Sequence, residues 1–158
     1  MLDAMQASSD SAPAFSARRS VSTCVAGEMV AARHIPGDLW PVNKGAVEGI
    51  PGVFVKNERS SISVKTPQWY AVAVMVGAYN VGSIRLTANR ELGFSRTGEW
   101  IPFDGAISVS KAEELGIFEL GSTVVLLLDA ALGKALGDGA FPPPGTLIRM
   151  GEAIFLPA

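Results

Sequence analysis

The residues with the clearest chemical potential are the neighbours Gly121 and Ser122. They lie between two apolar, strand-like runs, Ile117–Leu120 and Thr123–Leu128. Glycine accepts backbone angles that other residues avoid, so a Gly-Ser pair between two strands is typical of a bend. The same bend can hold the serine hydroxyl against the carbonyl of the preceding residue. The pattern leaves a simple turn and a reactive peptide bond both open.

Other candidate residues have simpler explanations. His34 precedes a turn, and we interpret it as a surface or packing residue. Glu113 and Glu114 are adjacent, so on a strand their carboxylates would point to opposite faces, and a solvated bend accounts for them. The sequence has one histidine and one cysteine, Cys24, which leaves no histidine pair for zinc and no partner for an internal disulfide. No metal site is predicted.

The elements around these residues predict a mainly β domain. Trp69–Val76 is continuously apolar, which indicates a central strand buried on both faces. Asp129–Leu136 has helical propensity, and residues 110–116 could form one helical turn or a polar bend. The other predicted strands are Gly27–Ile35, Ser61–Lys65, Ser83–Thr87, Ile101–Val109, Thr146–Met150 and Ala153–Leu156.

The composition is that of one folded domain preceded by a tail. The 158 residues are 48% apolar and 18% charged, far from the composition of a disordered chain. Residues 1–26 are expected to form a loose N-terminal tail, and residues 27–158 the domain. The net charge of −2 gives no footprint for nucleic acid. No apolar stretch reaches the ~20 residues of a membrane-spanning helix, although the chain could still lie against a membrane surface.

Several segments, taken in order, resemble the phosphatidylserine decarboxylase family. The resemblance covers about residues 27–155. It is carried by five segments: Pro36-Gly37-Asp38-Leu39-Trp40-Pro41-Val42-Asn43, Ile50–Arg59, Val76–Ile84, Glu113–Val125 and Ile148–Ile154. Five segments in the family's order form a strong signal, whereas any one alone would be weak.

The resemblance implies an enzyme that forms its own pyruvoyl cofactor by cleaving its chain. Ser122 would attack the carbonyl of Gly121, the resulting ester would break by β-elimination, and residue 122 would become an N-terminal pyruvoyl group. That group would form a Schiff base with phosphatidylserine, from which CO₂ leaves to give phosphatidylethanolamine. The implied fold is a β-rich α+β domain with the cleavage site on a hairpin. The implied workplace is the cytoplasmic face of the cell membrane, and a homo-oligomer is left open.

The sequence departs from the family upstream of the matched region. The family has a histidine-bearing stretch there, and its two histidine positions fall on Arg19 and Ser22 when counted back from Gly27 without gaps. Neither side chain can accept and return a proton near neutral pH as imidazole does. The family's upstream aspartate and its amphipathic N-terminal region have no counterpart, since Asp3 and Asp10 lie in unmatched sequence.

Two interpretations follow from this departure, with a rival from another class. In the first, which we favour, the chain is an N-terminally truncated or degenerate member in which cleavage at Gly121–Ser122 is impaired. In the second, His34 or a partner chain supplies the missing base. The rival is a non-enzymatic β-rich binding module in which Gly121–Ser122 is only a bend.

Overall fold

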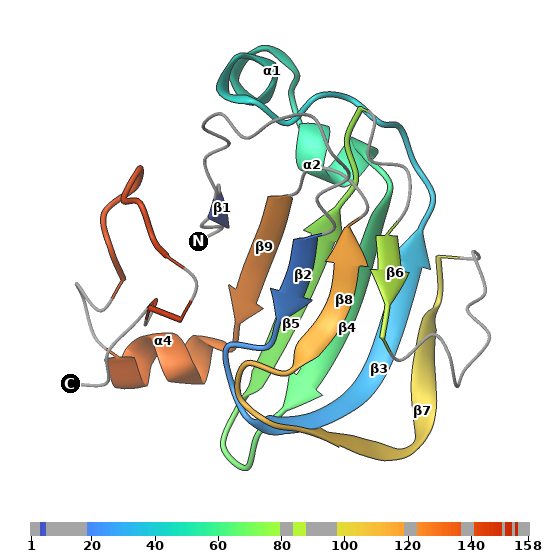
Figure 1. The fold of residues 1–158 in the computed structure, drawn as a ribbon, viewed down its shortest axis with the longest axis vertical. Coiled ribbons are helices and arrows are strands. Elements are labelled where there is room, and N and C mark those ends of the chain that lie inside the picture. Colours follow the sequence, from blue (N-terminus) through green and yellow to red (C-terminus); the bar gives the residue numbers. More distant parts are fainter. Residues whose placement is uncertain are drawn as a thin grey trace.

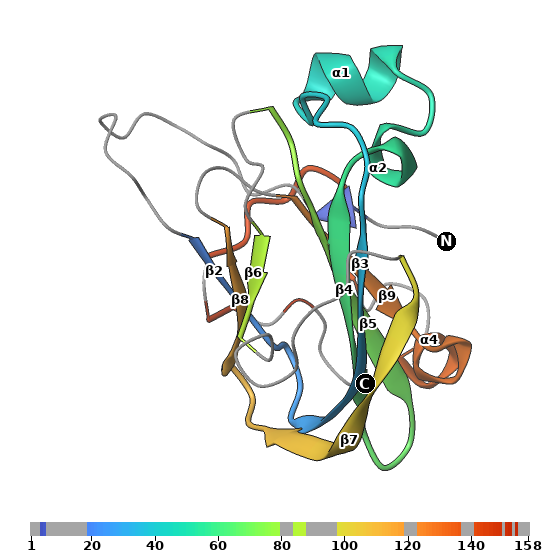
Figure 2. The ribbon, with the colours of Figure 1, turned by 90° about the vertical axis from the view of Figure 1, so that its right-hand side faces the viewer.

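A computed structural model gives the fold of the chain. It describes residues 4–5, 19–79, 84–87, 98–118, 123–136, 141–149, 151–152 and 154. Two antiparallel sheets face each other in it (Figures 1 and 2). The larger sheet has the order β1-β9-β5-β4-β3-β7 and the smaller one the order β2-β8-β6.

The large sheet holds most of the long strands. Its members, in sheet order, are β1 (Ala4–Met5), β9 (Thr123–Leu128), β5 (Tyr70–Val76), β4 (Arg59–Lys65), β3 (Gly27–Ile35) and β7 (Trp100–Val109). The small sheet consists of β2 (Arg19–Ser22), β8 (Glu114–Phe118) and β6 (Ile84–Leu86).

The core lies between the two sheets. In β5, Ala71, Ala73 and Met75 are buried, while Val72 and Val74 on the other face are only half-buried. The predicted central position of this strand is confirmed, but one of its faces is buried more completely than the other. Gly116 of β8 leaves room for the facing sheet, because a Cβ there would lie 3.0 Å from Sδ of Met75 in β5, and also 2.7 Å from the carbonyl oxygen of Arg85 in the neighbouring strand β6. The buried cluster comprises Met29, Ala32, Ile62, Val64, Ala73, Met75, Ala78, Leu86, Val109, Leu115 and Phe118.

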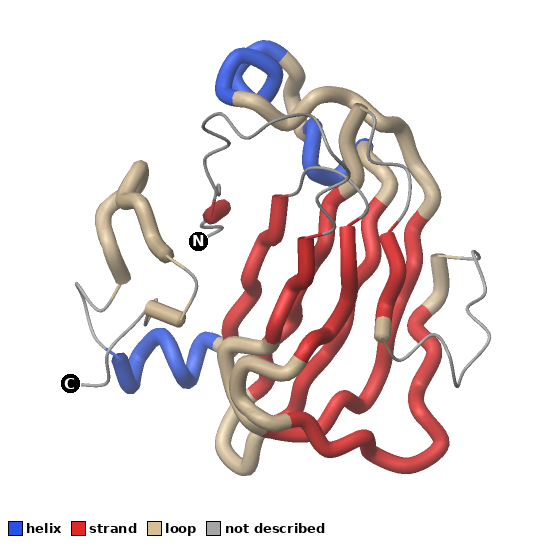
Figure 3. Tube along the Cα trace, in the orientation of Figure 1, coloured by secondary structure: helices blue, strands red, loops and turns tan. Residues whose placement is uncertain are grey.

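Short helices lie at both ends of the strands (Figure 3). At one end are α1 (Lys44–Gly49), whose first turn is capped by the Asn43 side chain, and α2 (Val53–Lys56). At the other end is α4 (Ala130–Leu136), where the Asp129 carboxylate accepts from the Ala131 N–H at 2.8 Å. The mainly β class predicted from the sequence is confirmed.

The expected hairpin is not formed by the strands that flank Gly121–Ser122. β8 pairs with β2 and β6, whereas β9 pairs with β5 and β1, so the two strands belong to different sheets. Two apolar strands joined by a short link can either pair with each other in one sheet or lie face to face in two packed sheets. Here they lie face to face, and the Gly-Ser pair is compatible with both arrangements.

The two ends of the chain also differ from expectation. Arg19–Ser22, expected in the tail, pairs with β8, because Val21 packs against the core. The predicted strand Thr146–Met150 is not formed over residues 146–149, which are irregular and follow a turn in which the Thr146 N–H and hydroxyl both donate to the Pro143 carbonyl. Met150, Ala153 and residues 155–158 lie outside the described residues.

Candidate active site

The candidate site is described through the residues that flank it, because Gly121 and Ser122 themselves lie outside the described residues. On one side, β8 ends at Phe118, which is fully buried. On the other, β9 begins at Thr123, which is 3% exposed and pairs with Val76. Buried residues therefore hold the chain on both sides of the four-residue link 119–122.

The link passes from the small sheet to the large one. β8 ends and β9 begins at the end of the molecule that carries α1 and α2 (Figure 1). Phe118 lies between Arg19 of β2 and Ile84 of β6, its partners in the small sheet. Arg19 and Ile84 therefore pair with the residue before the link, and Val76 pairs with the residue after it.

The Asn57 side chain joins the segments of Trp40 and Gly77 by hydrogen bonds at this end of the large sheet. It is fully buried, donates to the carbonyls of Trp40 at 2.7 Å and Gly77 at 2.9 Å, and accepts from the Trp40 N–H at 3.0 Å. Gly77 directly follows Val76, the partner of Thr123. Asn57 therefore fixes the end of β5 to which the start of β9 is paired. Sequence reasoning missed this role, and the only signal was an asparagine two residues after the apolar run Val53–Val55.

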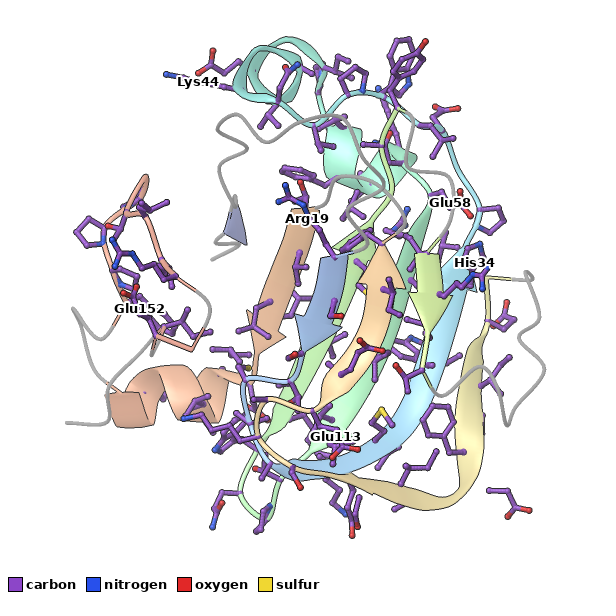
Figure 4. The ribbon with its side chains drawn as sticks, viewed as in Figure 1. Arg19, His34, Lys44, Glu58, Glu113 and Glu152 are labelled. Carbon is purple, nitrogen blue, oxygen red and sulfur yellow. The ribbon has the colours of Figure 1, made fainter. Side chains whose placement is uncertain are left out.

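His34 is held by a buried polar cluster of its own. Its Nδ1 lies 2.9 Å from the Ser60 hydroxyl and its Nε2 lies 3.1 Å from the Glu58 carboxylate (Figure 4). The strand register runs from His34 through Ser60 and Met75 to Val124. Three strand spacings separate the backbone of His34 from β9 by roughly 14 Å. His34 is therefore buried beside Ser60 and Glu58, and its backbone lies three strands away from the start of β9.

Arg19 and Ser22 occupy opposite ends of β2. Arg19 pairs with Phe118, the last described residue before the link, whereas Ser22 pairs with Glu114. The two positions are about 10 Å apart along the strand. Of these two residues, onto which the resemblance places the family's histidines, only Arg19 pairs with the last described residue before the link.

The remaining polar residues act locally. Glu113 is exposed and its carboxylate accepts from the Ser110 N–H at 2.7 Å, while Glu114 accepts from the Ser20 hydroxyl at 2.6 Å. These carboxylates stabilise a bend and a strand pair. Burial raises the pKa of the Cys24 thiol, against smaller opposing effects of a backbone hydrogen bond and the Lys111 charge. Among the residues that the structure describes, none form a group that could ligate a metal, and no helix could span a bilayer.

Comparison with known proteins places the chain among decarboxylases. The profile of the family described as phosphatidylserine decarboxylase matches residues 20–156. The chain is 36% identical over 132 residues to a phosphatidylserine decarboxylase proenzyme of Anaeromyxobacter sp. (strain K), covering 81% of this chain and 46% of that protein. It is 40% identical over 134 residues to the proenzyme of Halorhodospira halophila, covering 82% and 44%. A relative from Methylibium petroleiphilum is 37% identical over 134 residues, covering 81% and 45%.

These matches identify the family. The chain belongs to the phosphatidylserine decarboxylase family. It spans slightly less than half the length of the curated relatives that it matches.

Proposed function

We propose that this chain is a proenzyme that cleaves itself at Gly121–Ser122 and then decarboxylates phosphatidylserine to phosphatidylethanolamine. The observation that carries the proposal is the family match over residues 20–156, which includes the Gly-Ser pair. The buried positions of Phe118 and Thr123 support it, because fixed flanks limit the conformations of the reacting link.

Self-cleavage needs a proton acceptor at two points. The Ser122 hydroxyl must lose its proton as the oxygen attacks the Gly121 carbonyl carbon; the peptide C–N bond then breaks and an ester forms. Loss of the Ser122 Cα proton next expels the Gly121 carboxylate by breaking the Cβ–O bond. The dehydroalanine so formed isomerises to an imine, and water hydrolyses that imine, which releases the amino nitrogen as ammonia and leaves a pyruvoyl group at residue 122. The products are residues 1–121 and a second piece that begins at residue 122.

The residues present fit the pyruvoyl group, because it is made from the chain's own Gly-Ser pair. It would be held covalently through residue 122, directly before the buried Thr123. When formed, it supplies an electron sink for the carboxylate bond of an amino acid headgroup. The described side chains contribute the frame: Asn57 fixes the end of β5, and β5 fixes the start of β9.

We expect self-cleavage in this chain to be slow. Arg19, the residue beside the link, carries a guanidinium group, which has N–H donors and no acceptor and therefore cannot act as the base. Loss of a general base lowers a rate by about 10²–10⁴. His34 does not replace it, since its ring nitrogens face Ser60 and Glu58.

The proposed substrate is a bilayer lipid, so the proposed site of action is the cytoplasmic surface of the cell membrane. An assembly of several copies stays a prediction.

The proposal is tested by incubating the full chain with phosphatidylserine carrying a labelled carboxyl carbon. We expect labelled CO₂ and phosphatidylethanolamine in proportion to the fraction of cleaved chain. Ser122→Ala is the control, and it should produce neither. Cleaved protein that releases no CO₂ from phosphatidylserine would refute the proposed substrate.

A further inference from the structure

One end of the molecule presents an apolar surface to solvent. We define the apolar cap as residues 36–56, which join β3 to β4 and contain α1 and α2, together with Tyr79 after β5. Its exposed apolar side chains are Leu39, Trp40, Val47, Val55 and Tyr79, and the last two are 68% and 69% exposed. Single exposed apolar residues are ordinary, but five of them at one end of the molecule indicate an interaction surface.

The cap is fastened to the sheet. Asn57 bonds both Trp40 and Gly77, which holds the start of the cap next to the segment that carries Tyr79. The Asp38 N–H donates to the Lys56 carbonyl at 2.9 Å and the Glu58 N–H donates to the Asp38 carbonyl at 2.8 Å. Gly37 permits this closure, since a Cβ there would lie 2.4 Å from the Lys56 oxygen. A surface held in this way needs little reordering on binding.

Charge distinguishes the two ends of the molecule. The charged residues of the cap are Asp38, Lys44, Glu48 and Lys56, which sum to zero. Asp38 accepts from the Trp40 indole N–H at 3.2 Å, and Glu48 lies 4.0 Å from Lys44. The strand ends, turns and α4 at the opposite end carry four carboxylates and three lysines, a net charge of −1: Glu28, Glu113, Glu114, Asp129, Lys65, Lys111 and Lys134. A negatively charged surface therefore repels the cap less than it repels the opposite end.

We propose that the apolar cap is the surface by which this chain lies on an anionic phospholipid bilayer. The proposal rests on the proposed function, because a bilayer lipid is its substrate. Tryptophan and tyrosine favour the boundary between hydrocarbon and water, and lysine can keep its charge in water while its stem lies on apolar surface. The cap lies at the end where β8 stops and β9 starts (Figure 2), so docking brings the Gly121–Ser122 link toward the headgroups.

The first experiment measures co-sedimentation of the full chain with vesicles of phosphatidylcholine containing about one third phosphatidylserine. We expect binding, and weaker binding to vesicles of phosphatidylcholine alone. The variant Val55→Ser/Tyr79→Ser should weaken binding by about tenfold or more, because two exposed apolar side chains are lost from the contact. Leu147→Ser is the matched control, since Leu147 is also 69% exposed but lies outside the cap, and its binding should be unchanged.

The second experiment uses the three tryptophans as position markers. Trp40 lies on the cap, Trp100 begins β7 with a similar exposure, and Trp69 lies in the β4–β5 turn at the opposite end. In three single-tryptophan variants, made by Trp→Phe changes at the other two positions, brominated lipids should quench Trp40 and leave Trp69 and Trp100 unquenched. Quenching of Trp69 or Trp100 in place of Trp40 would overturn the proposal.

Two further outcomes would also overturn it. Failure of the unaltered chain to bind either vesicle is one. The other is a dimer in vesicle-free solution that Val55→Ser/Tyr79→Ser dissociates, which would identify a second copy as the occupant. Self-cleavage is measured separately on the same proteins in lipid-free buffer. If the unaltered chain cleaves itself but does not bind vesicles, only the docking surface is refuted. If it binds vesicles but does not cleave itself, only the proposed function is refuted.

Discussion

Arg19 is the residue whose replacement should accelerate self-cleavage most. It pairs with Phe118, the last described residue before the link, in a position where the resemblance places a histidine of the family. Arg19→His places an imidazole there, and we expect self-cleavage to become about 10²-fold faster or more at neutral pH. Intact mass measured over time gives the rate.

Ser22→His is the matched control for that change. It also restores a histidine at a family position, but at the end of β2 that pairs with Glu114. We expect no acceleration from it alone. Equal acceleration by both variants would show that the register of β2 does not determine access to the link.

Cys24 gives a pH-dependent prediction at the same scale. Burial raises the pKa of its thiol, so at a given pH less thiolate is present in the folded chain than in the unfolded one. Alkylation should be slower in the native protein and should accelerate only at a pH above that needed for the denatured protein. A native rate equal to the denatured rate across pH 7–9 would contradict the burial of this side chain.

At the scale of elements, Asn57 is the residue that joins the cap to the sheet. Asn57→Ala removes three hydrogen bonds from a fully buried position, and we expect the free energy of unfolding to fall by about 1–3 kcal/mol. Denaturant unfolding measures it. Asn43→Ala is the matched control, because Asn43 is exposed and caps only α1, and its cost should be about 1 kcal/mol or less. A smaller loss for Asn57→Ala than for Asn43→Ala would contradict the role given to Asn57.

The sequence predicts individual strands well and their partners poorly. Gly27–Ile35 and Thr123–Leu128 form strands with the predicted bounds, because their apolar patterns are local properties. The assignment of β8 and β9 to different sheets depends on contacts between distant segments, and no local pattern encodes it. The same limit hid the strand Arg19–Ser22, whose partner lies about a hundred residues later in the sequence.

At the scale of the whole molecule, the candidate site is assembled from segments that meet only after folding. The order of family segments predicts Gly121–Ser122 as the reactive pair, and that assignment stays a prediction. The neighbourhood of Arg19, the clamp of Asn57 and the enclosure of His34 by Ser60 and Glu58 could not be predicted, because each joins residues from separate strands or loops.

The fold also predicts what happens after cleavage. β9 pairs with β5 along its whole length and lies inside the large sheet, so the piece that begins at residue 122 should stay bound to the first. Size-exclusion chromatography of cleaved protein should give one peak under native conditions and two in denaturant. Separation of the pieces without denaturant would contradict the paired position of β9.

The central claim is that the peptide bond between Gly121 and Ser122 breaks by the action of Ser122. Intact mass under denaturing conditions, followed over days at neutral pH, measures this directly. The account predicts slow conversion of the 158-residue chain into residues 1–121 and a piece starting at residue 122 with a blocked N-terminus, and no conversion of Ser122→Ala. A chain that stays whole for as long as its Ser122→Ala variant, even after Arg19→His, would contradict it.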